Sequence, residues 1–498
     1  MAFQDMREFL EFLKNKNQLI EVDTELNAAR GTTELQPLMR HIHNINGPAL
    51  MLNNLSGYNH PDIPVLFNPY GTRERTSMIL GKERPLEGKL KFTEVLTNRS
   101  LWIKPNMIDR AEATCKQVII EKKDIDLSQQ LPHVWFGKEG PSYITNAVVI
   151  SKDPETGQLN TGCYRLTQLW NASHPLGEEY SEEEQKKCLS IFAFWNPPGN
   201  DIGRQWAKAQ EMNKPLELAI ACIVDPAVQI AAATSITYGE DEMDFAGGLR
   251  GEGVDVVQCE TVDLAVPATA EWVIEGTFLP ERDIAIGPHS NPVGYYDDAQ
   301  ILPLIEVDCI THRKDPIWYA TMEMEPPFDH NYMACMPLEG EVLSDLQTKI
   351  PEVLDVVVTP NLSYFVQLSV DGEQKPRADF GKEVLQAVWG ANGRWGPTAK
   401  LVVVVGPDVN PYDLSEIEWA IQTRVQPQTD TIINEAGQAF LMDPSAVKDP
   451  GHGIALVSEQ VGIDATIKIP ERFESYPKYS NAEPEDVIAI AEKLQGVL

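Results

Sequence analysis

The chain has 498 residues, of which 43% are hydrophobic and 23% are charged, and its formal net charge at pH 7 is −33. This composition is that of a globular protein with enough apolar material for two or three domains. The strong negative charge argues against proteins that bind nucleic acid or anionic lipid, because both tasks need clustered Lys and Arg.

The N-terminal segment, residues 1–115, alternates helix and strand. Asp5 suits a helix N-cap, and the apolar residues after it predict a helix that ends at 15–17. Strands are expected at 19–22, 49–52 and 65–67, and helices at 33–43 and from about Arg73. This alternation indicates an α/β segment.

The middle of the chain, residues 116–315, is rich in short strand-like runs separated by turn clusters such as 153–157. Repeated short strands with few long helices indicate a β-barrel. The acidic stretch 178–187 is expected to form an exposed helix. The expected strands are 117–120, 147–151, 218–223, 254–259, 272–276 and 304–310.

The C-terminal part, residues 316–498, returns to an α/β pattern. Strands are expected at 353–358, 364–370 and 401–405, and helices at 381–389 and 414–423. The tail 484–498 predicts an amphipathic helix, which could dock on or swap with another chain or could pack on its own core.

The seven cysteines are scattered and contain no Cys-x-x-Cys pair. This is typical of reduced thiols and not of a disulfide framework or a zinc site. The N-terminus shows no signal-peptide pattern, and no apolar run approaches the ~20 residues that span a bilayer. We therefore expect a cytoplasmic protein without a membrane partner.

Four local patterns occur in order along the chain, and together they resemble the UbiD decarboxylase family. They are NTGCYR (160–165), EMDFAGGLRG (242–251), VPATAE (266–271) and WAIQTR (419–424). The run GTRER (71–75) is similar as well. Each pattern alone is weak, but the ordered set spans nearly the whole chain.

The resemblance implies an α/β fold with an N-terminal α/β segment, a central split β-barrel that binds flavin and a C-terminal α/β domain for oligomerisation. It also implies reversible decarboxylation of an aromatic or α,β-unsaturated acid, with carbon dioxide as the other product. The implied cofactor is prenylated FMN, supplied by a flavin prenyltransferase and held through a manganese-like ion (alternatively magnesium or iron) with K⁺ nearby. A homo-oligomer, dimer or hexamer, is expected.

The resemblance also assigns metal ligands. Asn160 and Glu242 match two of them, and an amide or carboxylate oxygen suits a hard divalent cation. The third family ligand is a histidine, which this chain lacks; Asn196 takes its place, with Asn200 or Asp201 as alternatives. Without the resemblance, Asn160 would be interpreted as a turn residue and Glu242 as one surface acid among several.

Arg165 matches the arginine that would hold the substrate carboxylate beside the flavin, a task that suits a guanidinium. Alone, it could be an ordinary surface arginine at a strand end. The residues that match cofactor-binding positions of the family are Asn160, Thr161, Tyr164, Arg165, Thr234, Ser235 and Arg394. Arg424 is a less specific addition to this set.

The largest departure from the family concerns proton transfer. The family commonly has acidic residues where this chain has Ile286 and Asn291, and neither of these can exchange a proton near neutral pH. His330 and His289 are the candidate replacements, because histidine titrates in the right range. Glu323 and Glu325 are further acids, but they lie further away in the chain.

Three explanations of this departure stay open: another residue transfers the proton, the substrate carries an activating group, or the chain is a non-catalytic paralogous subunit that binds the cofactor. The departure favours the branch of the family that acts in anaerobic aromatic metabolism on arenes, phenylphosphate or aryl-CoA. A flavin redox protein with the same barrel is a further alternative, although no Gly-x-Gly-x-x-Gly follows a strand.

Overall fold

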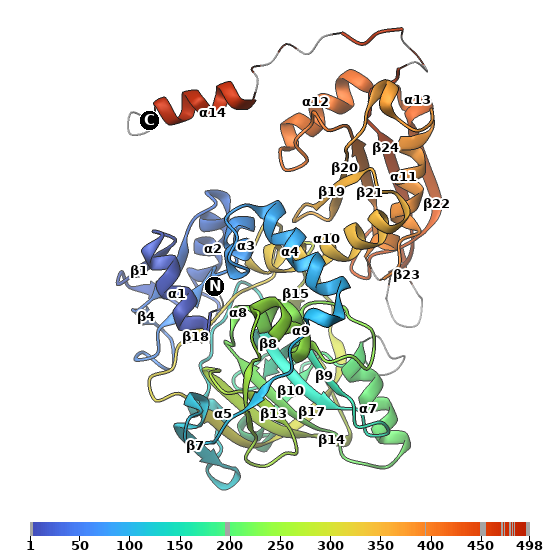
Figure 1. Cartoon of the computed structure of the whole chain (residues 1–498). Coiled ribbons are helices and arrows are strands. Elements are labelled where there is room, and N and C mark those ends of the chain that lie inside the picture. The colour runs from blue at the N-terminus through green and yellow to red at the C-terminus, as the bar shows by residue number, and fades with distance from the viewer. Residues whose placement is uncertain are drawn as a thin grey trace.

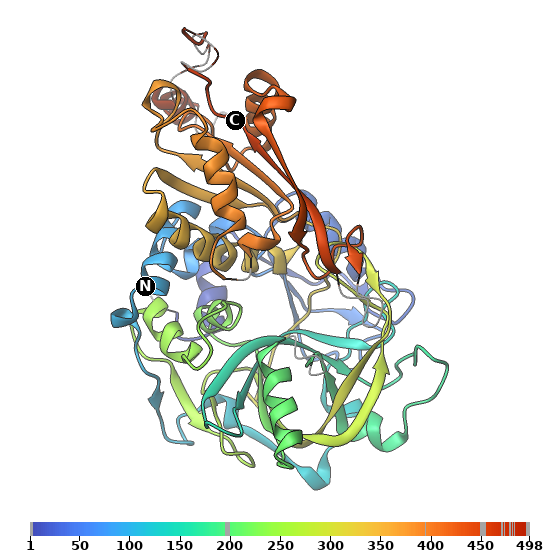
Figure 2. The ribbon, with the colours of Figure 1, turned by 90° about the vertical axis from the view of Figure 1, so that its right-hand side faces the viewer.

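The computed structural model describes residues 3–194, 200–393, 395–448, 455–469, 472, 474–477, 480, 482 and 484–494. Three parts follow one another along the chain: an N-terminal layer, a central barrel and a C-terminal sheet domain (Figures 1 and 2). Within the described ranges no helix is both long and apolar enough to cross a membrane.

The N-terminal layer is the predicted α/β segment. Asp5 caps its first helix by accepting a hydrogen bond from the Glu8 amide at 2.9 Å. Its sheet has the order β1-β3-β5-β18, so a strand from late in the chain completes it. The elements are α1 (Met6–Asn15), β1 (Leu19–Val22), β2 (Leu26–Asn27), α2 (Leu35–Asn44), β3 (Ala49–Leu52), β4 (Leu55–Ser56), β5 (Val65–Phe67), α3 (Arg73–Ile79), α4 (Pro85–Thr97) and β18 (Trp318–Tyr319).

The central part is the predicted barrel. Its strand order is β10-β9-β8-β11-β14-β17-β7, and β10 also pairs with β17, which closes the sheet on itself. The strands are β7 (Val118–Glu121), β8 (Ser142–Lys152), β9 (Leu159–Gln168), β10 (Cys188–Ile191), β11 (Glu217–Cys222), β14 (Trp272–Ile286) and β17 (Gln300–His312).

Several elements of the barrel region were not predicted. The strand β9 was missed because NTGCYR is a polar run without β-type alternation. The predicted strand at 254–259 exists as β12 (Asp255–Gln258), but it lies in a separate small sheet with β6 (Asn106–Met107) and β13 (Ala265–Pro267). The missed helices are α5 (Leu127–Gln130), α7 (Asp201–Glu211), α8 (Pro226–Ala232) and α9 (Glu242–Arg250), whereas α6 (Glu182–Lys187) is the predicted acidic helix.

The C-terminal domain begins with α10 (Asp329–Lys349), which the sequence did not predict because buried side chains lie all round it and Pro337 interrupts its pattern. Its sheet has the order β19-β20-β21-β24-β22, with β20, β21 and β24 parallel. The elements are β19 (Val353–Val358), β20 (Ser363–Leu368), α11 (Phe380–Trp389), β21 (Leu401–Val405), α12 (Leu414–Arg424), α13 (Pro427–Asp430), β22 (Thr431–Gln438), β23 (Val447–Lys448) and β24 (Ala455–Asp464).

A buried charge network joins the N-terminal layer to the C-terminal domain. Lys89 of α4 is 2% exposed, and its Nζ lies 2.5 Å from Asp355 Oδ1 and 3.1 Å from Glu339 Oε2. Arg73 of α3 pairs with the other oxygen of Glu339 at 2.5 Å. Breaking a buried pair of this kind is costly, so the network fixes α10 between the two parts.

The last helix, α14 (Pro484–Lys493), stands away from the C-terminal sheet (Figure 1). Its apolar residues Val487 and Ile490 are 54% and 55% exposed. The tail was predicted either to dock on another chain or to pack on the chain's own core. For these two side chains, packing on the chain's own core is wrong.

Candidate active site

Arg165, on β9, is the centre of the candidate site. Its side chain is 11% exposed, and the guanidinium lies 5.5 Å from the ring centroid of Tyr143 and 5.4 Å from that of Phe192. One terminal nitrogen donates to the Ser290 carbonyl at 2.8 Å, and the other forms an ion pair with Glu323. Burial lowers the pKa of a cation, but the neighbouring glutamates offset this, so the pKa of Arg165 is raised and the group stays charged.

Glu323 reaches Arg165 because of the chain path. The strand β18 joins the N-terminal sheet beside β5, and α10 then starts at Asp329, so the segment between them passes the barrel. The pKa of Glu323 would be raised by burial, but Arg165 and His330 outweigh this and lower it to about 2. His330 Nδ1 lies 3.3 Å from Glu323 Oε1. Glu323 is therefore a permanent anion that holds both the arginine and the histidine.

A second buried carboxyl, Glu139, also interacts electrostatically with Arg165. It comes from the turn before β8 and is 7% exposed. Its Oε1 accepts hydrogen bonds from the Ser290 hydroxyl at 2.8 Å and the Ser290 amide at 3.3 Å. Burial raises the pKa of Glu139 to about 7, because Arg165 and Ser290 offset the loss of water only in part.

The position of Glu139 depends on a close approach between two loops. The Gly140 amide donates to the Pro288 carbonyl at 3.1 Å. A Cβ at residue 140 would lie 2.3 Å from the Gly287 carbonyl oxygen, so only glycine fits there. This contact holds the turn that carries Glu139 against the segment that carries Ser290.

His289, the other predicted histidine, lies beside these groups and is 6% exposed. Its Nε2 is 3.4 Å from Asp297 Oδ2, and its ring stands edge-on to Phe192 at 4.8 Å. Burial lowers the pKa of His289 despite the nearby Asp297. A buried imidazole of this kind is neutral near pH 7.

A second cluster gathers most of the residues predicted to hold a metal and cofactor. The Thr161 amide donates to Glu242 Oε2 at 2.9 Å, which brings Glu242 beside Asn160 at the start of β9. The Asn160 amide nitrogen lies 3.4 Å from the Tyr164 hydroxyl. Four of the predicted residues thus meet in one place, although the strand that unites them was not predicted.

The electrostatics of this cluster fit a cation. Glu242 is 9% exposed, and among the described residues no Lys, Arg or His forms an ion pair with it. Burial, with smaller contributions from Asp241 and Asp201, raises the pKa of Glu242 to about 8. A divalent cation would supply the missing positive charge, and Asn160 would add a neutral oxygen ligand.

The remaining predicted site residues are only partly placed. Asn196 and Arg394 lie outside the described residues. Asn200 caps α7 by accepting from the Gly203 amide at 3.0 Å, so Asp201 is the better placed of the two alternatives. In the described part of the chain no three His, Cys, Asp or Glu side chains gather closely enough to hold a metal on their own.

Thr234 and Ser235 lie at the end of α8. Thr234 donates to the Ile230 carbonyl at 2.8 Å, and the Ser235 amide donates to Glu341 at 3.2 Å. Arg424 lies in the C-terminal domain, where its guanidinium bonds to Asp408 at 2.6 Å.

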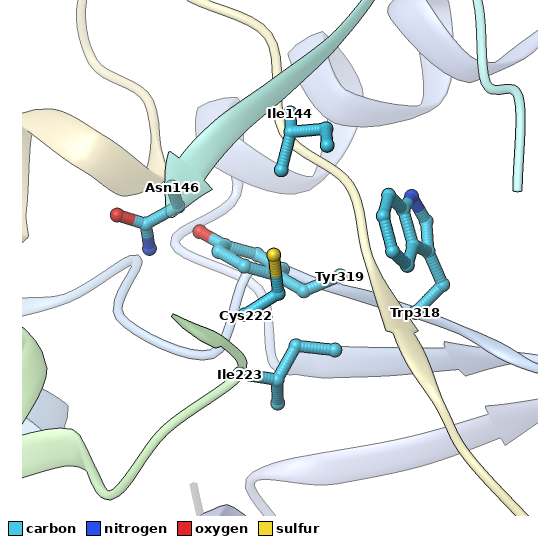
Figure 3. A pocket seen from close by; sticks show the side chains of 6 residues that line it. All are labelled: Ile144, Asn146, Cys222, Ile223, Trp318 and Tyr319. Atoms are coloured by element: carbon cyan, nitrogen blue, oxygen red, sulfur yellow. The ribbon is translucent and has the colours of Figure 1, made fainter. Parts of the chain in front are cut away.

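A small cavity lies between the barrel and β18 (Figure 3). It adjoins β9 indirectly, because the Asn146 side-chain oxygen accepts from Gln229 at 2.8 Å and Gln229 also contacts Cys163. Its lining is Ile144, Asn146, Cys222, Ile223, Trp318 and Tyr319. Since Arg165 and its partners are not among these residues, we interpret the cavity as a packing defect separate from the Arg165 cluster.

Sequence reasoning did not find Glu139, and it noted Glu323 only as one of two acids distant in the chain. The only local signal at Glu139 is a charged residue in a Lys-Glu-Gly-Pro turn before a buried strand, which is typical of many surface turns. The approach of both glutamates to Arg165 depends on tertiary structure alone.

Comparison with known proteins gives three adjoining family matches. They are the N-terminal domain of 3-octaprenyl-4-hydroxybenzoate carboxy-lyase (UbiD) over residues 10–89, its Rift-related domain over residues 106–326 and its C-terminal domain over residues 331–465. A curated protein of Archaeoglobus fulgidus, described as uncharacterized, is 31% identical over 94% of this chain and 92% of its own length.

Two solved structures are similar over nearly their whole length. Vanillic acid decarboxylase of Sedimentibacter hydroxybenzoicus (ShVdcCD, open form, with truncated ShVdcD) is 27% identical, with a TM-score of 0.83 over 100% of this chain and 99% of that one. HmfF of Pelotomaculum thermopropionicum, a UbiD-class enzyme in complex with FMN, is 26% identical, with a TM-score of 0.82 over 97% and 98% of the two chains.

Proposed function

Because the chain belongs to the UbiD family of carboxy-lyases, we propose that it catalyses the reversible decarboxylation of an aromatic or α,β-unsaturated carboxylic acid with prenylated FMN. We further assign it to the metabolism of aromatic compounds. Vanillic acid decarboxylase, which the chain resembles over its full length, acts on an aromatic acid.

The observation that carries this proposal is the environment of Arg165. A buried guanidinium needs anionic partners, and Glu323 and the Ser290 carbonyl use only part of its donor set. The remaining donors can bind a substrate carboxylate in the two-point geometry that arginine favours. The rings of Tyr143 and Phe192 beside it provide apolar surface for a flat ring.

The second cluster supports a metal-held cofactor. Asn160 and Glu242 would hold a divalent ion of manganese, magnesium or iron type, and Thr161, Tyr164, Thr234 and Ser235 would contact the cofactor, with K⁺ nearby. The buried carboxylate of Glu242, which has no cationic partner in the described structure, is the feature that a metal would complete. Prenylated flavin, when bound, serves as the acceptor for the electron pair left by carbon dioxide.

The chain's own residues have distinct tasks in this proposal. Arg165 orients the carboxylate, and Glu323 holds the guanidinium in place through their ion pair. His330 fixes the second oxygen of Glu323 and is a positioning residue. The buried rings around Arg165 keep water away from the reacting carbon, which strengthens every charge interaction there.

We also propose that α14 mediates homo-oligomer formation. Its exposed Val487 and Ile490 would be buried by a second copy of the chain, as an unpartnered apolar helix face requires. A chain ending at residue 480 should lose the oligomer in light scattering while keeping its helix and strand content. An unchanged mass would contradict this role.

A second candidate is a cofactor-binding subunit without turnover, because Ile286 and Asn291 occupy the positions of the family's acids. The related ShVdcCD structure includes a second component, ShVdcD. Full prenylated-flavin occupancy without exchange on any acid, together with a co-purifying chain, would favour this candidate.

The test is exchange of labelled bicarbonate into the carboxyl group of a substrate. The protein is produced together with a flavin prenyltransferase and assayed without oxygen on vanillate, 4-hydroxybenzoate, phenylphosphate and aryl-CoA thioesters. Exchange that depends on prenylated flavin is expected to fall roughly 10²-fold or more in Arg165→Ala. Arg282→Ala, which removes an exposed arginine, is the matched control and should leave the rate unchanged. Loss in both variants, or in neither, would contradict the assignment.

A further inference from the structure

Removing a carboxyl group as carbon dioxide leaves a carbon that must take up a proton. The two positions where acids were expected cannot supply it. Ile286 is fully buried in an apolar cluster with Tyr143, Phe192 and Leu304. Asn291 shapes the loop between β15 (His289–Ser290) and β16 (Tyr296–Asp297), and its side-chain oxygen accepts hydrogen bonds from two backbone amides of that loop, at 3.0 and 3.2 Å.

Four carboxyl or imidazole groups of the described residues lie around Arg165, and three of them are already held by another charged or titratable side chain. Glu323 is held as an anion by its ion pair with the arginine. His289 is buried, and its lowered pKa makes it neutral at working pH. His330 is tied to Glu323 by its Nδ1. Glu139 is the fourth.

Glu139 is connected to Arg165 through one residue. The Ser290 hydroxyl and amide both bond to Glu139 Oε1, while the Ser290 carbonyl accepts from Arg165. The carboxyl therefore lies one side chain away from the group that would hold the substrate. Glu139 and Glu323 both interact electrostatically with Arg165. The pKa of Glu139 is raised to about 7, whereas that of Glu323 is lowered to about 2, so the two carboxyls differ in how readily they hold a proton.

We propose that Glu139, acting through the Ser290 hydroxyl, is the proton reservoir of this site. The inference rests on the proposed function and deepens it. When the bond to the carboxyl carbon breaks, the electron pair of that bond ends in a new C–H bond. Ser290 gives its proton to that carbon and takes one from Glu139, which becomes a carboxylate beside Arg165. A proton from water restores Glu139, and carboxylation runs the same transfers in reverse.

The charged and titratable neighbours of Glu139 set the direction of its pH dependence. They are Arg165 on β9, Glu323 before α10, Tyr143 on β8 and Tyr296 on β16. Release of the product needs the protonated acid, so decarboxylation should decrease as pH rises through about 7. Carboxylation needs the carboxylate and should increase over the same range.

The test separates carbon chemistry from proton transfer. Vanillate and 4-hydroxybenzoate are incubated with the prenylated-flavin enzyme in two assays: labelled bicarbonate entering the carboxyl group, and deuterium from heavy water entering the product ring. Glu139→Gln keeps an oxygen that accepts from Ser290 but carries no acid. We expect carboxyl exchange to persist and deuterium incorporation to fall roughly 10²-fold or more. Glu325→Gln, an exposed acid on the neighbouring segment, is the matched control and should change neither.

Two further variants and one spectroscopic measurement distinguish the inference from the proposed function. Ser290→Ala should reproduce the loss of deuterium incorporation, and Glu139→Asp should restore part of it with a shifted pH profile. In the protein without cofactor, an infrared carboxyl band that titrates near pH 7 should be absent in Glu139→Gln.

The outcomes are separable. Carboxyl exchange absent from the wild type would overturn the proposed function, while the infrared titration would still report on Glu139. Equal deuterium incorporation in wild type and Glu139→Gln, or the same infrared band in both, would overturn the role of Glu139. If Glu139→Gln does not fold, Ser290→Ala decides by the same criterion.

Discussion

The buried carboxyl of Glu139 should make the stability of the protein depend on pH, and Glu139→Gln should remove that part of the dependence. The folded chain keeps this proton up to about pH 7, whereas the unfolded chain releases it near the ordinary pKa of 4.5. Between these values the folded state binds more protons, so the free energy of unfolding falls as pH rises. The difference between the two pKa values corresponds to about 3 kcal/mol.

Unfolding by urea, followed by fluorescence in wild type and Glu139→Gln at several values from about pH 5 to about pH 8, measures this effect. Relative to wild type, the variant should gain about 2.5 kcal/mol across that range, because part of the full difference lies below pH 5. Asp225 and Asp329 also have a pKa raised to about 6 by burial, but they are present in both proteins and cancel. Glu325→Gln should run parallel to wild type. A constant difference between Glu139→Gln and wild type would refute a raised pKa at this position.

Three further variants test other contacts of the site. Gly140→Ala forces a Cβ to 2.3 Å from the Gly287 carbonyl oxygen, so it should lower the thermal midpoint of unfolding and also decrease deuterium incorporation. Gly157→Ala, at an open turn, is the control and should affect only stability. Glu242→Gln removes the charge that a divalent ion would balance, and retention of manganese and flavin after gel filtration should fall together; undiminished metal content would exclude Glu242 as a ligand. Ile286→Glu places an unpaired carboxylate in an apolar cluster and should cost several kcal/mol in unfolding at neutral pH, with Ile286→Leu as control; wild-type stability would show that the position tolerates an acid.

Much of the fold followed from local patterns. The run 401–405 is the strand β21 as predicted, because a β-branched stretch of that length suits a central parallel strand. The helix after Asp5 also forms as predicted, since its cap and its apolar spacing agree. The sequence did not predict elements whose buried side chains do not lie on one face only. The helix α10 is buried all round, and the strand β9 carries polar residues that face the site.

The residues of the candidate site also differ in whether a local pattern could identify them. Asn160, Thr161, Tyr164 and Arg165 lie within six residues of one strand, so a motif can identify them together. Glu139 and Glu323 approach Arg165 from the turn before β8 and from the crossing between β18 and α10. Nothing in their local sequence marks them, because the bond between Glu139 and Ser290 and the ion pair between Glu323 and Arg165 each join residues more than a hundred positions apart.

The placement of these two acids follows from the structural tasks of the positions where acids were expected. Residue 286 closes an apolar cluster at the end of β14, and a carboxylate there would be buried without a partner. Residue 291 needs an amide, because its nitrogen donates to Asp297 at 2.9 Å and an acid would set two carboxylates against each other. Because residues 286 and 291 both have structural roles, the negative charge that balances Arg165 has to come from other segments. Glu323 supplies a permanent anion and Glu139 a neutral acid, so the arginine is balanced by one charge and retains donors for the carboxylate of a substrate.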